Sequence, residues 1–251
     1  MLDFESLAKL VDSRGYRPLF VTVSGAHLYG FPSPDSDIDL RGSHLLPLEE
    51  VVGLHPPPGT LEEKLDHHGR EVELVSHDLG KYLRLLVRNN GYVLEQICSP
   101  LVVMGGEFLA RLRPLAAQCI TRHVYHHYRG FLNTQLRQLA REEPKRVKTV
   151  LYAYRVLLTG IHLLRTGEVE ANLLRLAQGF PLDFLAGLVA EKQAGELAPA
   201  TGFDWTFHQQ KLSELEAELD SAHRASLLPD RLPSSEVNRF LVRERLAARS
   251  D

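Results

Sequence analysis

Acidic, hydroxyl and glycine residues gather in one short stretch near the N-terminus, FVTVSGAHLYGFPSPDSDIDLRG, which runs from Phe20 to Gly42. Asp37 and Asp39 lie two residues apart in it, separated by the apolar Ile38. In a β-strand successive side chains point to opposite faces, so the two carboxylates share one face. Carboxylates this close destabilise a sheet unless a cation neutralises them, and oxygen ligands suit Mg²⁺ or Mn²⁺. The spacing therefore predicts a divalent metal site.

A second ion would need a third carboxylate from a neighbouring strand. The alternating segment Arg70 to His77 predicts such a strand, with Val72 and Leu74 facing the core. Glu73, flanked by them, is the candidate third acid on the opposite face. Glu71 lies on that face too and stays open as a fallback, because a shift of two residues preserves the alternation.

A glycine-bearing turn precedes the aspartates. The apolar run 18–23 predicts a strand, and the turn after it consists of Ser24, Gly25 and Ala26. Backbone N–H groups in such a turn point beyond the strand end, a position that favours phosphate. Ser36, directly before the acidic pair, adds a hydroxyl donor. Together these residues predict a site for a metal-bound phosphate.

The acidic pair has simpler interpretations as well. Two aspartates at this spacing also occur at solvated strand edges, as turn caps, or paired with a nearby arginine such as Arg41. The glycine turn and the third acid in register favour metal binding over these alternatives.

The chain has 251 residues, of which 44% are hydrophobic, and a formal net charge of -3. Its positive charge is concentrated in residues 106–165, which hold eleven Lys and Arg against three Glu. This local excess is compatible with RNA, with a protein acceptor, or with a triphosphate alone. Acids in the N-terminal segment, where a signal peptide has a basic start, and the lack of an apolar run of membrane-spanning length lead us to expect a cytoplasmic protein with no membrane partner. Cys98 and Cys119 lie in apolar surroundings and are expected to be buried thiols.

The pattern of the sequence changes once, near Gly105. Short elements broken by Gly and Pro precede it, and helical spacing follows it. We therefore expect an α+β fold, with a mixed-sheet domain at 1–105 and an all-helical domain at 106–251. The predicted helices of the second part are Glu107–Ile120, Arg122–Arg141, Pro144–Arg165, Pro181–Gly195, Phe207–Ala225 and Ser235–Arg249.

The helix predicted at Pro144–Arg165 has a polar stripe beside its apolar one. Lys148, Tyr152 and Arg155 begin this stripe at helical spacing. Two interpretations stay open for it: a cationic face that binds a triphosphate, or an ordinary solvent face.

These features together resemble the DNA polymerase beta superfamily of nucleotidyltransferases, in which a strand, a glycine turn, an acid-x-acid pair and a later third acid follow one another. The strings GAHLYG at 25–30, SDIDLRG at 36–42 and LVSHDLGKYLRLLVRNNGYVLEQI at 74–97 look like one predicted bacterial and phage branch associated with RNA ligases. The resemblance covers most of residues 18–100 and, more loosely, 148–169.

The resemblance implies an enzyme that transfers a nucleoside monophosphate from an NTP to an acceptor hydroxyl, such as an RNA end, and releases pyrophosphate. It implies two Mg²⁺ or Mn²⁺ ions on Asp37, Asp39 and Glu73, and a helical domain that closes over the nucleotide. The residues expected to bind the nucleotide are Ser24, Gly25, Ala26, Ser36, Lys148, Tyr152 and Arg155.

One position departs from the superfamily pattern. Ala26 stands where a serine usually provides a hydroxyl to the nucleotide's phosphates. Ala26 favours a second hypothesis, a non-catalytic protein that binds nucleotides or RNA ends, while the three acids favour the enzyme. A third hypothesis is an antitoxin-like interaction partner.

Overall fold

The computed structural model describes residues 2–195 and 204–248, which form two compact units. The first, here called the sheet unit, comprises Met1–Gly25, Asp37–Cys119 and Arg231–Asp251. The second, the helical unit, comprises Ala26–Ser36 and Ile120–Asp230. The predicted α+β class, a mixed sheet followed by helices, is confirmed. The bounds of the two units differ from the predicted division after residue 105. Residues 26–36 belong to the helical unit, and the sheet unit extends to residue 119 and takes up the chain again at residue 231.

The sheet unit is built on one mixed sheet with the strand order β3-β4-β2-β1-β5. Strand β2 runs parallel to β4, whereas β1 pairs antiparallel with β2 and β5, and β3 antiparallel with β4. Its strands are β1 (Pro18–Val23), β2 (Ile38–His44), β3 (Thr60–His67), β4 (Arg70–Asp78) and β5 (Val102–Met104). Its helices are α1 (Phe4–Asp12), α3 (Leu48–Val52), α4 (Leu79–Leu86), α5 (Gly91–Cys98), α6 (Gly106–Gln118) and α12 (Ser234–Ala247).

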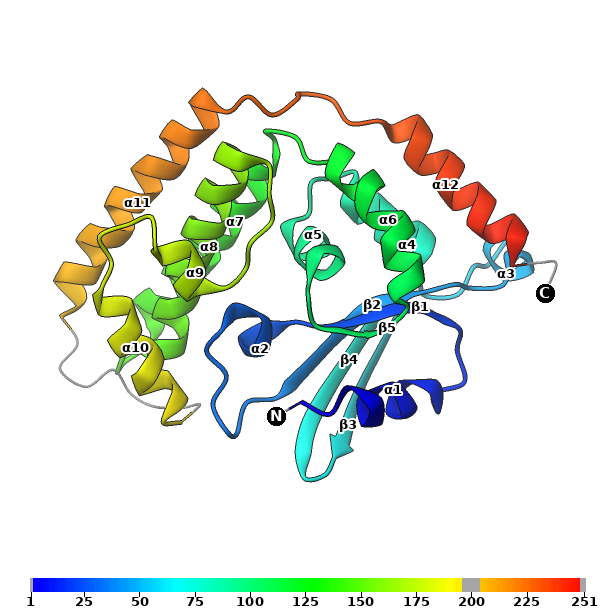
Figure 1. The fold of residues 1–251 in the computed structure, drawn as a ribbon, viewed down its shortest axis with the longest axis horizontal. Helices are drawn as coiled ribbons and strands as arrows, with labels where there is room; N and C mark the ends of the chain where they lie inside the picture. Colours follow the sequence, from blue (N-terminus) through cyan, green and yellow to red (C-terminus); the bar gives the residue numbers. More distant parts are fainter. Residues whose placement is uncertain (1, 196–203, 249–251) are drawn as a thin grey trace. The chain divides into compact units, whose positions relative to one another are not determined.

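Helices cover the two faces of this sheet separately (Figure 1). On one face Leu7 and Val11 of α1 are fully buried against strand residues, which are Val21, Val23, Ile38, Leu40, Val72, Leu74 and Val103. The predicted core-facing positions of the two acid-bearing strands are thereby confirmed. On the other face the ring of Phe20 contacts Tyr82 of α4 and Phe108 of α6, at centroid distances of 5.3 and 6.0 Å. The alternating acids of β2 and β4 therefore lie on the face opposite α1.

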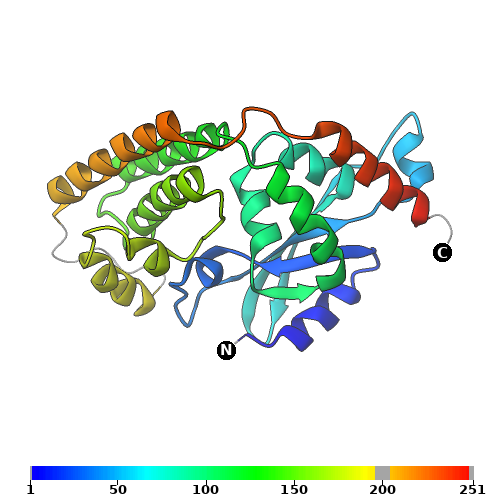
Figure 2. The same cartoon turned by 45° about the horizontal axis from the view of Figure 1, so that its top comes forward.

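The last helix, α12, is joined to this unit by a buried ion pair, and it lies along α4 and α6 (Figure 2). Arg245 donates to both carboxylate oxygens of Asp78, at 2.9 and 2.7 Å. Asp78 also caps α4 by accepting from the Gly80 backbone N–H at 2.8 Å. One carboxylate thus holds the end of β4, the start of α4 and the C-terminal helix together.

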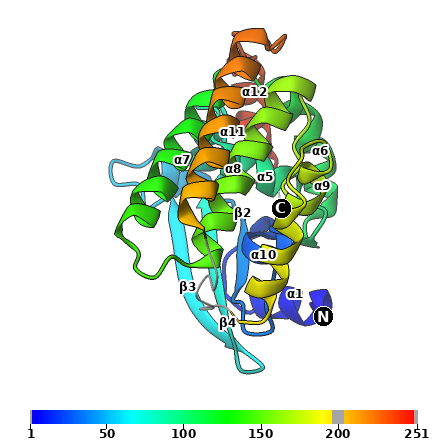
Figure 3. The same cartoon turned by 90° about the vertical axis from the view of Figure 1, so that its left-hand side faces the viewer.

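The helical unit is arranged around α8, which contacts α7, α9, α10 and α11, the other helices described in the 120–230 segment (Figure 3). Its helices are α2 (Gly25–Tyr29), which straddles the unit boundary, α7 (Val124–Arg141), α8 (Val147–Thr166), α9 (Leu173–Ala177), α10 (Phe184–Gln193) and α11 (Trp205–Ala225). The long predicted helices of this segment are present with ends shifted by a few residues. The five-residue α9 was not predicted, because one turn and a half is too short to show a periodicity.

Helix α8 is the one helix in the described part of the chain whose length and mean hydropathy, 1.2, suffice to cross a membrane. This corrects the expectation that no apolar run approaches that length. However, 83% of its apolar window is buried inside the structure, and the core helix of a helical unit passes the same test. The finding is therefore weak evidence for a membrane span.

The two cysteines differ in their environments. Cys119 is buried, as predicted, and burial raises the pKa of its thiol to about 11. Cys98 is exposed, so the prediction for it was wrong. It is the last residue of α5, whose buried side is already occupied by Val93, Leu94 and Ile97.

We expect Arg245→Met to lower the free energy of unfolding by about 3 kcal/mol, because it leaves the buried Asp78 carboxylate without its charged partner. Thermal melts would measure the effect. The matched control is Arg239→Met on the same helix. The Arg239 side chain is 70% exposed, and its ion pair with Glu236 is long, at 3.7 Å. Equal melting temperatures for the two variants would contradict the assigned role of Arg245.

Candidate active site

Polar side chains from adjacent strands form a row on the sheet face opposite α1. In the parallel pairing of β2 with β4, Asp39 lies level with Glu73. In the neighbouring antiparallel pair, Lys64 of β3 lies level with Glu73. At the end of β1 the Ser24 N–H donates to the Asp39 carbonyl oxygen at 2.8 Å. The register thus places Glu73, and not Glu71, beside Asp39.

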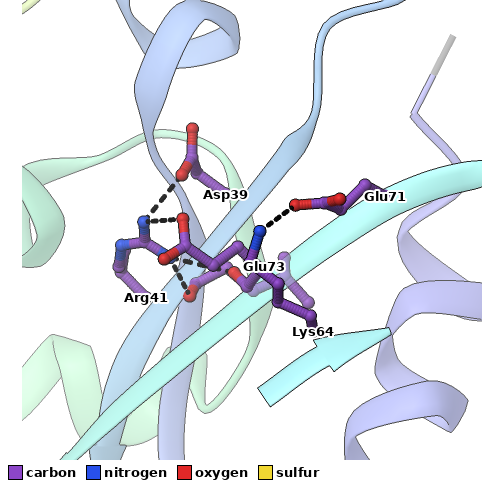
Figure 4. A network of polar contacts seen from close by, with 6 residues as sticks. Asp39, Arg41, Lys64, Glu71 and Glu73 are labelled. Atoms are coloured by element: carbon purple, nitrogen blue, oxygen red, sulfur yellow. Dashed lines mark hydrogen bonds and ion pairs between the residues drawn. The ribbon is translucent and has the colours of Figure 1, made fainter. Parts of the chain in front are cut away.

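Arg41 bridges the two acids (Figure 4). Its Nη2 donates to Asp39 Oδ1 at 2.7 Å and to Glu73 Oε2 at 2.8 Å. Its Nη1 donates to the backbone carbonyls of Glu73, at 2.9 Å, and Leu40, at 3.1 Å. Arg41 follows Asp39 by two residues, so its side chain extends along the same face of β2. The alternative interpretation, pairing with Arg41, thus describes Asp39 in this structure.

This arrangement sets the charge of the acids. The hydrogen bond from Arg41 is the largest effect that holds the pKa of Glu73 below its ordinary value, so Glu73 is ionised at neutral pH. Lys64 donates to Glu71 at 2.7 Å, and that hydrogen bond raises the pKa of Lys64 (Figure 4). The fallback acid Glu71 is thus engaged with Lys64 on an exposed part of the sheet.

Gly25 makes room for the Asp39 carboxylate. Its φ is +59°, in the left-handed region where glycine is favoured, and a Cβ built on it would overlap the carboxylate of Asp39. The predicted glycine turn is therefore present. A glycine is required in it because the Asp39 carboxylate lies where the side chain of any other residue would begin. Ser24, just before it, is 6% exposed.

Asp37 lies one residue before the start of β2 and is exposed. Within residues 2–195 and 204–248, no group of three or more His, Cys, Asp and Glu side chains is arranged to hold a metal ion. The oxygen donors of Asp37 and Asp39 suit a hard divalent cation. The place between Asp39 and Glu73, in contrast, is taken by Arg41. The residues present fit one ion better than the two that the sequence predicts.

The loop before the acids is held by a lysine that sequence reasoning missed. Lys192 of α10 is 1% exposed, and its Nζ donates to Ser33 Oγ at 2.9 Å and to Ser36 Oγ at 2.7 Å. The two hydroxyls are 2.9 Å apart, and Ser36 Oγ also accepts from the Ser33 N–H at 3.0 Å. The hydroxyl of Ser36, predicted to bind phosphate, is thus engaged within the helical unit.

The predicted polar stripe of α8 is largely internal. Arg155 is 0% exposed, and its guanidinium lies 4.0 Å from the ring centroid of Tyr29. The Tyr152 ring packs edge-on against Tyr29 at 5.5 Å and Phe31 at 5.8 Å. These placements give Arg155 and Tyr152 a packing role on the 26–36 segment, and nucleotide contact by Arg155 would require it to leave this position. Lys148 is partly exposed and stays a prediction for nucleotide binding. Ala26, at 6% exposure, has no hydroxyl to offer.

Comparison with known proteins agrees with this geometry. Residues 3–243 match the RlaP family, described as the RNA repair pathway DNA polymerase beta family. The chain belongs to this family. The predicted resemblance to polymerase beta-like nucleotidyltransferases is thereby confirmed at the family level. Members of the wider superfamily generally use divalent metal ions.

Two relatives of this RlaP chain are proteins described as uncharacterised. MJ0002 of Methanocaldococcus jannaschii is 33% identical over 155 residues, which is 62% of this chain and 63% of that protein. YcgL of Bacillus subtilis is 23% identical over 256 residues, which is 95% of this chain and 93% of that protein. The chain therefore spans somewhat less than two thirds of MJ0002.

We expect Gly25→Ala to destabilise the protein by more than Gly69→Ala. Both glycines have positive φ, +59° and +77°, so both variants carry the same type of backbone strain, about 1 to 2 kcal/mol. Only the Cβ at Gly25 also overlaps the Asp39 carboxylate, because nothing lies within 4 Å of a Cβ at Gly69. Thermal melts in EDTA and in Mn²⁺ would measure this, and Mn²⁺ should stabilise Gly69→Ala but not Gly25→Ala. Equal melting temperatures for the two variants, in EDTA and in Mn²⁺, would contradict a close contact between Gly25 and the Asp39 carboxylate.

We expect Lys192→Met to lower the free energy of unfolding by about 1 to 3 kcal/mol, because two buried hydroxyls lose a charged donor. Lys211→Met is the matched control, since Lys211 donates to the exposed Glu214 at 2.8 Å, and exposed pairs contribute less than about 1 kcal/mol. Chemical denaturation of both variants would test this. A Lys192 variant as stable as the control would show that the loop does not depend on this lysine.

Proposed function

We propose that this protein is a metal-dependent nucleotidyltransferase that transfers a nucleoside monophosphate from an NTP to an acceptor hydroxyl. The observation that carries the proposal is the placement of Asp39 beside the Gly25 turn and level with Glu73, in a chain of the polymerase beta-like RlaP family. The family description, an RNA repair pathway, makes an RNA end the acceptor that we propose.

In the proposed reaction the acceptor oxygen attacks the α-phosphorus of the NTP. A bond forms between that oxygen and the α-phosphorus, and the bond from the α-phosphorus to the oxygen bridging to the β-phosphate breaks. Pyrophosphate leaves, and the hydroxyl proton passes to solvent. Phosphoryl and nucleotidyl transfer of this kind depend mainly on positioning and on charge stabilisation.

The residues of this chain divide these tasks. Asp37 and Asp39 would hold a divalent ion, which when bound neutralises charge on the triphosphate. Gly25 keeps the turn close to the Asp39 carboxylate, and Arg41 fixes that carboxylate by a 2.7 Å hydrogen bond. Glu73 Oε2 accepts from the same Arg41 nitrogen, Nη2, at 2.8 Å. Lys192 anchors the loop whose last residue, Ser36, directly precedes Asp37.

A non-catalytic protein that binds nucleotides or RNA ends is the second candidate. Two observations favour it: Ala26 lacks the usual turn hydroxyl, and Arg41 already neutralises two of the three acids. A binding protein of this kind would bind NTP without releasing pyrophosphate, so a single assay separates the two candidates.

We expect Asp37→Asn and Asp39→Asn each to lower the transfer rate by about 100-fold or more, because each removes a ligand of the divalent ion that would neutralise charge on the triphosphate. The assay incubates protein, Mn²⁺, each α-labelled NTP and an RNA with a free 3′ hydroxyl, and follows label in RNA and pyrophosphate release. Glu71→Gln is the control that should keep wild-type rates, since Glu71 pairs with Lys64 outside the proposed site. Binding of NTP by the wild type without any transfer to RNA, protein or small hydroxyl compounds would favour the second candidate.

A further inference from the structure

The Arg41 guanidinium lies between the carboxylates of Asp39 and Glu73. Its Nη2 lies 2.7 Å from Asp39 Oδ1 and 2.8 Å from Glu73 Oε2. An ion coordinated by the same two oxygens would lie about 2.1 Å from each of them. The nitrogen and such an ion would therefore compete for one space between the two carboxylates.

Backbone contacts hold the guanidinium there independently of the carboxylates. Nη1 donates to the carbonyl oxygens of Glu73, at 2.9 Å, and Leu40, at 3.1 Å. The Arg41 side chain is 19% exposed, so most of it is removed from solvent. An ion arriving between the acids would have to displace four hydrogen bonds of one side chain.

Asp37, the other acid of the proposed metal site, is more exposed than Asp39 and Glu73. Asp37 is exposed and lies one residue before the start of β2, two residues before Asp39 in the sequence. The Asp39 carboxylate has one oxygen, Oδ1, on Arg41 and the other, Oδ2, beside Gly25. Asp39 thus reaches Arg41 with one oxygen and the glycine turn with the other.

We propose that this protein binds a single divalent ion, through Asp37 and Asp39, and that the Arg41 guanidinium supplies the positive charge that a second ion would supply. Glu73 then serves as a partner of Arg41 and is a positioning residue. The inference rests on the proposed function for the use of the ion, but the number of bound ions is measured without any transfer reaction.

The test counts Mn²⁺ bound per chain at saturation, from the electron paramagnetic resonance signal of free Mn²⁺. The sample contains an ATP analogue that cannot be cleaved between its α- and β-phosphates, and a protein-free sample with the analogue corrects for its own binding. We expect one ion for the wild type and two for Arg41→Ala. Arg14→Ala, which removes an arginine paired with Glu63 at 3.4 Å, is the matched control and should bind one.

Glu73→Gln provides a second test that leaves Arg41 in place. If Glu73 is not a ligand, this variant keeps one ion with an affinity within about twofold of wild type, whereas Asp39→Asn loses it. Two ions on the wild type, one on folded Arg41→Ala, or an ion lost in Glu73→Gln would each overturn the inference and leave the proposed transferase intact. No ion on the wild type in the presence of the analogue would overturn the proposed function as well.

Discussion

Two carboxylates level with each other on neighbouring parallel strands repel each other, and a cation between them removes that cost. Asp39 and Glu73 are in this position, and at a separation of about 5 Å their repulsion is on the order of 1 to 3 kcal/mol, depending on exposure. Arg41 removes that penalty and adds hydrogen bonds to the backbone of both strands. Arg41 thereby allows both acids to lie side by side across the β2–β4 pairing, next to the Gly25 turn.

Much of the fold could be predicted from the sequence because it depends on local periodicity. The alternation of Ile38 and Leu40 with acids placed β2 correctly, and the same argument placed Val72 and Leu74 in the core. The helical segments after residue 105 were equally visible from their spacing. Of the candidate site, the glycine turn and the choice of Glu73 over Glu71 agree with the register found.

The remaining features depend on contacts between residues distant in the sequence. Lys192 reaches Ser33 and Ser36 across more than 150 residues, and no local pattern marks a lysine as buried. The helical spacing of Arg155 is equally compatible with a solvent-facing and a ligand-binding side chain. Its contact with the ring of Tyr29, from a distant part of the sequence, shows that it is internal. The role of Arg41 had a visible signal, because Arg41 follows Asp39 by two residues and so shares its face of β2. That Arg41 would pair with Glu73 could not be predicted, because this contact depends on the parallel register of β2 with β4.

The helical unit consists of residues 26–36 and 120–230, and in the sequence each of these segments is flanked on both sides by segments of the sheet unit. The sheet unit accordingly contains the first and the last described segments of the chain, and Arg245 joins the last one to Asp78. A stop codon placed after residue 119 would therefore not yield an intact sheet unit, since Asp78 would lose its partner and the 26–36 loop would lose Lys192. Any redesign of the 120–230 segment must therefore still supply a partner for Ser33 and Ser36 in the loop that leads into Asp37.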